Sequence, residues 1–500
     1  MAFSRQAHVI HTGGDGVLAT TATADIDAMA DAICGVERAV LHFHGGLVSE
    51  DAGFRTAQRL FGTYEAADAY PVFFVWRSGI REIVTGNLGE MAGEELFKRL
   101  LRKIVKYTVG KVQQTDGDRA AAVLPTPDEM SVNRELVRRQ RDEEPYDHVE
   151  APPEVAAVTN DERGELETEI AEDTQIQDDL AAVLAWHTGT TEAGARGVYV
   201  ATPQPSRMSP DVLDQLAERD EGARGILGGL ALAKKAAAVF VRVIQRFSNH
   251  TDHGVYPTTV EELLREFYLA GIGGALWQAM KRETLDTFTQ DEPSHGGAYL
   301  LDRVAAGLTA RAAAGERLPE ITLVGHSTGA VFIDHLVEAV DKRRVEFPSG
   351  FRFRNVVFLA PACTYDHFAT ALSAARLIDR FRMFTMTDEA ERADHLVRGI
   401  YPRSLLYFVA GVLERDDQGR SAYRRVAGMA RYLDGDDGGA RGGGLAAVRA
   451  YLTADRDRLV RSPSLARAAL GLRSGATTHG GFDDDRLVLE SVTEMIRGEL

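Results

Sequence analysis

The chain has 500 residues, of which 44% are hydrophobic and 26% are charged, and its formal net charge is -17. This length and apolar content suffice for a globular protein with a large core, and the acidic charge argues against a broad electrostatic contact with nucleic acid. The two cysteines, Cys34 and Cys363, fit neither a disulfide framework nor a cysteine-rich zinc site.

The amino-terminal segment has no apolar stretch of signal-peptide length after its first arginine. The most apolar long stretch, residues 226–247, is interrupted by lysines and arginines that would be costly at the centre of a bilayer. The sequence therefore predicts a cytoplasmic protein without a transmembrane segment.

Residues 1–80 contain a β-α-β pattern, in which apolar strand candidates at 38–44 and 71–76 flank a helical pattern at 50–67. The same alternation returns after residue 297, with strand candidates at 320–324, 355–359, 382–386 and 404–409. Nearly continuous apolar strands that alternate with helices predict an α/β fold, with a mostly parallel sheet covered by helices on both faces.

Residues 81–296 lack this alternation and are predicted to form a large, mainly helical insertion or cap between two parts of one core, 1–80 and 297–500. Within the insertion, residues 142–179 are crowded with Asp and Glu, which predicts an acidic loop. Two amphipathic helical patterns in it carry basic residues. Such helices pack onto an enzyme core or lie on a membrane surface, so peripheral membrane contact stays an open alternative.

The segment 321–330 reads ITLVGHSTGA and contains the pattern G-x-S-x-G, after a strand candidate and before a helical pattern. A serine at a sharp strand-to-helix turn has a strained backbone, and small flanking residues let other backbones approach. Ser327 is therefore the candidate nucleophile, and its turn consists of Gly325, His326 and Gly329.

Amide donors for a negatively charged oxygen are expected on two loops. The N–H of Thr328 lies at the start of the helix that follows the serine. The first predicted strand ends in His44-Gly45-Gly46-Leu47, where Gly46 or Leu47 is the candidate for the second donor.

A base and an acid are expected after the serine. His479 lies in the glycine-rich segment THGGF, where a loop leaves its ring free to approach a nucleophile. Asp388 directly follows a strand candidate and is the predicted acid that orients the histidine. Asp366, after the preceding strand, is the alternative acid, and Asp394 is a third.

The segments HFHGGL, GHSTG and THGGF, with an acid between the last two, resemble the α/β-hydrolase superfamily, in particular its lipases and esterases. The resemblance covers residues 38–80, about 297–410 and the His479 loop, and does not cover the insertion. It implies a mostly parallel sheet of eight strands in which the nucleophile follows the fifth strand.

The resemblance implies a serine hydrolase that cleaves carboxylic esters through a Ser-His-Asp triad and an acyl-enzyme, with neither cofactor nor metal. A thioester, a phospholipid acyl bond or a peptide would use the same groups. A thioesterase, a peptidase and a membrane-associated phospholipase are therefore alternatives, and a non-catalytic interaction protein on a hydrolase scaffold is another.

Overall fold

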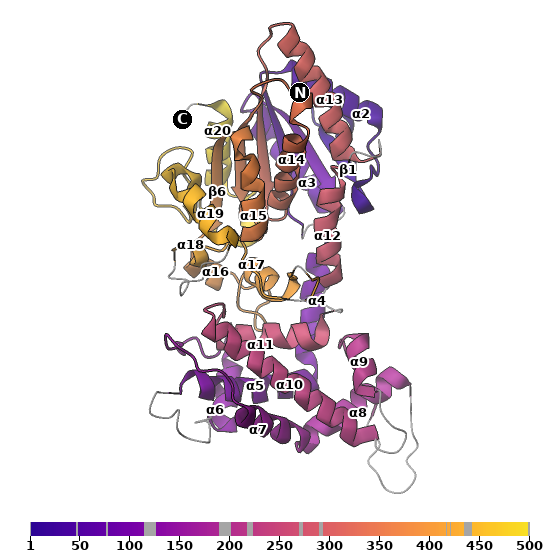
Figure 1. The fold of residues 1–500 in the computed structure, drawn as a ribbon, viewed down its shortest axis with the longest axis vertical. Coiled ribbons are helices and arrows are strands. Elements are labelled where there is room, and N and C mark those ends of the chain that lie inside the picture. Colours follow the sequence, from indigo (N-terminus) through magenta and orange to yellow (C-terminus); the bar gives the residue numbers. More distant parts are fainter. Residues whose placement is uncertain are drawn as a thin grey trace.

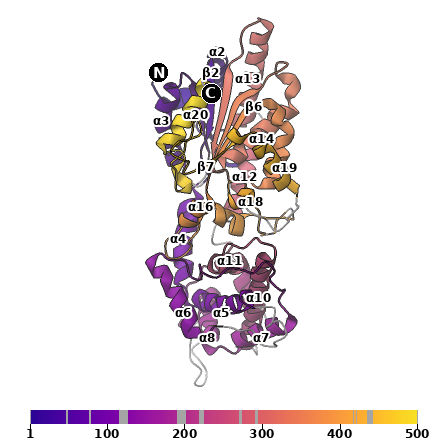
Figure 2. The same ribbon diagram turned by 90° about the vertical axis from the view of Figure 1, so that its left-hand side faces the viewer.

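The molecule has two lobes, one built around a β-sheet and one made of helices (Figures 1 and 2). The computed structural model describes residues 2–46, 49–76, 79–114, 127–189, 202–217, 224–269, 274–289, 294–416, 418–420, 422–434 and 443–498.

The sheet consists of seven strands, all paired in parallel, in the order β1-β3-β2-β4-β5-β6-β7. The strands are β1 (Val9–Thr12), β2 (Arg38–Phe43), β3 (Tyr70–Trp76), β4 (Glu320–His326), β5 (Phe353–Leu359), β6 (Ile378–Met386) and β7 (Leu459–Ser462). Successive residues contact opposite layers, since Val40 packs with one apolar cluster and Leu41 with the other. The predicted α/β fold with a parallel sheet is confirmed.

Helices cover both faces of the sheet, which explains why its central strands are apolar along their whole length. One face packs against α2 (Thr23–Gly35), α13 (Gly296–Ala313), α14 (Gly329–Lys342), α15 (Tyr365–Ala371) and α19 (Gly443–Thr453). The other face packs against α3 (Glu50–Glu65) and α20 (Arg486–Arg497). The short helix α1 (Arg5–His8) precedes β1.

The second lobe, called here the helical lobe, lies beyond one end of the sheet (Figure 1). It contains α5 (Glu95–Val112), α6 (Glu129–Val137), α7 (Asn160–Ala171), α8 (Thr174–Thr188), α9 (Pro210–Ala217), α10 (Arg224–Ser248) and α11 (Val255–Leu263). Helices α4 (Ile80–Gly93) and α12 (Gly274–Asp286) lie between the two lobes in Figure 1. Among the described residues, no helix combines the length and the apolar character needed to cross a bilayer.

Two helices, α7 and α8, occupy much of the stretch 142–179, so the prediction of an acidic loop is wrong there. Their carboxylates pair with the basic residues of α5. Lys111 Nζ lies 2.7 Å from Glu162 Oε1, and Lys103 Nζ lies 2.9 Å from Glu169 Oε1. The ion pairs with α5 offset part of the repulsion among the carboxylates of this segment.

The segment 404–409 was expected to be a strand and is instead the helix α17 (Leu405–Phe408), followed by a π-helical turn over Val409–Leu413. A short apolar run of this kind fits a buried helix as well as a strand, because both bury every side chain. The helix α16 (Asp388–Ala393) separates α17 from β6, and α18 (Arg431–Asp434) follows it.

Candidate active site

The serine of the G-x-S-x-G motif lies in a strained turn between β4 and α14. Ser327 has φ of 54°, in the left-handed region that residues with a side chain rarely adopt. Its backbone is held from the neighbouring strand, since its N–H donates to Leu359 O at 2.8 Å and its carbonyl accepts from Ala362 N at 3.0 Å. The turn therefore presents the hydroxyl at the carboxyl edge of the sheet.

The glycines of the motif lie where neighbouring backbone segments come too close to leave room for a side chain. A Cβ added to Gly329 would lie 2.2 Å from the carbonyl oxygen of Phe43, at the end of β2. A Cβ on Gly325 would lie 2.6 Å from the backbone of Gly329. Both contacts are with backbone atoms, which have little freedom to move away.

The structure brings His479 to Ser327, although 152 residues separate them in the sequence. His479 Nε2 lies 2.9 Å from Ser327 Oγ, and both side chains are buried. The histidine begins a single 3₁₀ turn over His479–Gly481. Its carbonyl oxygen accepts a hydrogen bond from His326 Nε2 at 2.9 Å, so the residue before the serine also fixes the histidine loop.

Asp394, the third of the candidate acids, contacts the His479 residue through its carboxylate. Asp394 Oδ2 accepts from the backbone N–H of His479 at 2.7 Å. Asp388, the expected acid, begins α16, and its Oδ1 accepts from the Tyr407 hydroxyl at 2.5 Å. Asp366 accepts from Gly444 N at 3.1 Å. Helix α16 accounts for the difference, because it separates Asp388 from Asp394 by more than one turn.

The loop after β2 lies directly against the serine turn. A Cβ added to Gly46 would lie 2.5 Å from Thr328 Oγ1, and one added to Gly45 would lie 3.3 Å from Ser327 Cβ. The Thr328 residue is fully buried at the start of α14, where helix N–H groups lack intrahelical acceptors. Leu47, the other candidate donor of this loop, lies outside the described residues.

His44 holds the loop in place, a role that the sequence did not indicate. Its ring stacks on Trp76 with centroids 3.9 Å apart and an interplanar angle of 6°. Its Nδ1 lies 2.7 Å from Gly45 O, and its Nε2 accepts from Trp76 N at 3.3 Å. Burial lowers the pKa of His44 to about 4, so the ring is neutral at pH 7 and contributes no charge beside the serine.

A cavity of about 520 Å³ opens onto the serine and histidine, and polar side chains outnumber large aliphatic ones among the residues that line it. The charged and ionisable side chains in this lining include Arg59, Asp394, His395, Asp483 and Asp484. Among the described lining residues, Leu396 and Leu405 are the large aliphatic ones. Arg59 comes from α3 and Asp483 from the loop after His479, and no sequence motif marks either residue.

Within the described ranges, no group of three or more His, Cys, Asp or Glu side chains is arranged to hold a metal ion. Comparisons of the chain with protein-family models, with curated proteins and with solved structures found no match. The geometry of the site is therefore what indicates its chemistry.

Proposed function

We propose that the protein is a serine hydrolase that cleaves small carboxylic esters. The observation that carries this proposal is the 2.9 Å contact between His479 Nε2 and the hydroxyl of a serine with positive φ. A strained strand-to-helix turn that exposes a serine to an imidazole is the arrangement in which a serine is activated as a nucleophile.

In the first half of the reaction, Ser327 Oγ attacks the ester carbonyl carbon while its proton passes to His479 Nε2. The tetrahedral oxyanion lies near the amides of Thr328 and Gly46, for which the close packing of the two loops is the support. The C–O bond to the alcohol then breaks, and the alkoxide takes the proton from the imidazolium.

In the second half, water attacks the acyl-serine, and its proton passes through His479 back to Ser327 Oγ as the carboxylic acid leaves. We assign Asp394 as the acid of the triad, because its carboxylate fixes the backbone of His479 and lines the same cavity. A carboxylate there also favours the positive imidazolium that forms in each half-reaction.

Only two large aliphatic side chains, Leu396 and Leu405, lie among the described lining residues, which favours a small or polar acyl group over a long alkyl chain, because a long chain needs apolar walls to displace water. The basic side chains of α5 pair with carboxylates of α7 and, through Arg99 and Asp179, of α8, which leaves less positive charge for a membrane surface. Both observations favour an esterase over a membrane-associated phospholipase.

Hydrolysis of p-nitrophenyl acetate and p-nitrophenyl palmitate by the wild type and by Ser327→Ala tests the proposal. We expect kcat/KM to be at least about 100-fold higher for acetate, and Ser327→Ala to lose about 10⁴-fold or more of the activity. Equal activity of the two proteins on acetate would exclude Ser327 as the nucleophile. A preference for palmitate would support the lipase alternative.

A further inference from the structure

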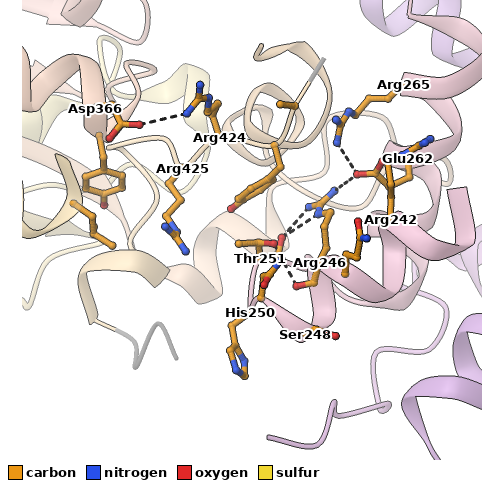
Figure 3. A pocket seen from close by; sticks show the side chains of 16 residues that line it. Arg242, Arg246, Ser248, His250, Thr251, Glu262, Arg265, Asp366, Arg424 and Arg425 are labelled. Atoms are coloured by element: carbon orange, nitrogen blue, oxygen red, sulfur yellow. Dashed lines mark hydrogen bonds and ion pairs between the residues drawn. The ribbon is translucent and has the colours of Figure 1, made fainter. Parts of the chain in front are cut away.

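A second cavity, of about 640 Å³, lies between the helical lobe and the sheet lobe (Figure 3). Its walls share no residue with the active-site cavity. One wall comes from the end of α10, the loop after it and α11, and the other from α15, the segment 422–425 and Leu445. Five arginines line it, in a chain whose formal net charge is -17.

The arginines on the wall of the helical lobe are held in position by glutamates. Arg242 Nε lies 2.9 Å from Glu262 Oε2, and Arg265 Nη1 lies 2.6 Å from Glu262 Oε1. Arg246 Nη1 lies 2.6 Å from Glu261 Oε2. Glu266 also pairs with Arg242, so the charges on this wall balance. Arg246 also donates from Nε and Nη2 to Thr251 O. Each guanidinium has five N–H donors, so Arg242 and Arg246 are fixed in place and keep donors that these contacts do not use.

The opposite wall carries donors without protein acceptors. In the described part of the chain, the buried Nε of Arg425 has no hydrogen-bond partner, and the guanidinium makes no ion pair but lies over the Tyr432 ring, 5.6 Å from its centroid. The buried hydroxyl of Tyr423 has no hydrogen-bond partner among the same residues either. The backbone of Arg425 is fixed, since its carbonyl accepts from Tyr365 N at 3.0 Å. A buried donor without an acceptor costs about 1 to 3 kcal/mol, and a bound acceptor would remove that cost.

The remaining charged groups of the cleft do not neutralise the positive charge of Arg425. Arg424 lies 3.6 Å from Asp366, whose side chain is 63% exposed and faces solvent as well. His250, in the loop after α10, lies on the wall of the helical lobe (Figure 3). The cleft is thus rich in donors, and the guanidinium of Arg425 has no carboxylate partner among the residues that the structure describes.

We propose that this cleft binds a small ligand through a phosphate or diphosphate group, which bridges Arg425 and Tyr423 on the sheet lobe and the arginines of α10 on the helical lobe. A planar guanidinium matches the geometry of phosphate oxygens and forms two parallel hydrogen bonds with them. A diphosphate has enough oxygens to accept from both walls. The site is independent of the proposed hydrolase activity.

Calorimetric titration of the full chain with inorganic pyrophosphate at low ionic strength tests the proposal. We expect one equivalent to bind, Arg425→Gln to weaken binding at least 10-fold, and Tyr423→Phe to weaken it at least 3-fold. Arg317→Gln is the matched control, since it removes the same charge at a side chain that is 72% exposed, and it should change binding less than 2-fold. Ser327→Ala should bind like the wild type.

Absence of binding to the wild type, or equal weakening by Arg425→Gln and Arg317→Gln, would overturn the proposal. Tyr423→Phe keeps the ring and the charge, so it separates loss of the site from misfolding of Arg425→Gln. A parallel titration with vesicles that contain phosphatidic acid distinguishes a lipid head group from a soluble phosphate. Vesicle binding that depends on Arg425 assigns the lipid source, and pyrophosphate binding alone assigns the soluble one.

Discussion

His479 reaches Ser327 because the backbone of the histidine is held from both sides. Asp394 accepts from its N–H, and His326 donates to its carbonyl oxygen. The two partners come from different parts of the chain, the end of α16 and the turn at the serine. The position of the imidazole therefore depends on residues that do not themselves touch the hydroxyl.

Asp394 is the carboxylate proposed to assist His479. Asp394→Asn keeps an acceptor for the His479 N–H but removes the negative charge that favours the imidazolium. We therefore expect it to lower kcat/KM for p-nitrophenyl acetate by about 10³- to 10⁴-fold, the loss typical of a triad carboxylate. Asp388→Asn and Asp366→Asn are the matched controls, since both carboxylates have other partners, and each should cost less than about 10-fold. A larger loss with Asp388→Asn than with Asp394→Asn would contradict the assignment.

The buried carboxyl group of Glu391 should make the free energy of unfolding depend on pH. It is fully buried beside the Ser404 hydroxyl, and burial raises its pKa to about 8. The folded protein therefore keeps a proton that the unfolded chain releases near its ordinary pKa of about 4.3. The stabilising contribution is complete at low pH, falls above that value and is lost as the pH rises through about 8.

Glu391→Gln should remove this dependence, because glutamine stays neutral at every pH. Between pH 5 and 8, the free energy of unfolding of the wild type should fall relative to the variant by about 1.4 kcal/mol per pH unit. Urea denaturation at several pH values measures both slopes. Parallel curves for the two proteins would show that Glu391 is ionised in the folded state.

At the scale of elements, the serine turn depends on contact between the start of α14 and the end of β2. Gly329→Ala would place a methyl group 2.2 Å from Phe43 O, so we expect it to destabilise the protein by about 1 to 3 kcal/mol and to lower esterase activity. Gly62→Ala in α3 is the control, because nothing lies within 4 Å of its added Cβ. It should be neutral or stabilise by up to about 1 kcal/mol. Urea denaturation that gives both variants the same stability would contradict this packing.

The sequence predicted the elements whose apolar pattern is long and continuous. It located β2, β3, β4, β5 and much of β6, because strands buried on both faces are apolar at every position. It missed β1 (VIHT) and β7 (LVRS), two four-residue edge strands that contain polar residues. Such strands are defined by pairing with a neighbour, which a local pattern does not record.

For the site residues too, prediction succeeded where the local sequence records the feature and failed where a distant contact defines it. Ser327 was predicted because its motif records a local backbone constraint, and His479 because glycines follow it. Asp394 was ranked low because its contact is with a backbone N–H and depends on where α16 ends. In the same way, the sequence of α5 does not show that carboxylates of α7 and α8 pair with its basic side chains.

At the scale of the whole molecule, buried polar contacts join the two lobes. Arg403 is 2% exposed, and its Nη2 lies 2.7 Å from Glu144 Oε1 and donates to His253 O at 2.9 Å. The Tyr256 hydroxyl donates to Ile400 O at 2.9 Å. The segment 400–403 of the sheet lobe is thus bound to residues on both sides of α10 in the chain.

Arg403→Ala should weaken this contact, because it leaves Glu144 with an uncompensated charge. We expect a loss of about 3 kcal/mol in the free energy of unfolding, and calorimetry should resolve separate transitions for the two lobes. Arg398→Ala is the control, since it removes another pair between the lobes, to Asp142, at a side chain that is 82% exposed. It should cost less than about 1 kcal/mol. Similar losses of stability in the two variants would contradict a stabilising buried contact between the lobes at Arg403.

The most direct test of the hydrolase proposal is covalent labelling with a fluorophosphonate probe, followed by mass spectrometry to locate the adduct. The proposal predicts an adduct on Ser327 in the wild type, slower labelling in His479→Ala and no adduct in Ser327→Ala. An unlabelled wild-type protein, or equal labelling of the wild type and Ser327→Ala, would contradict it.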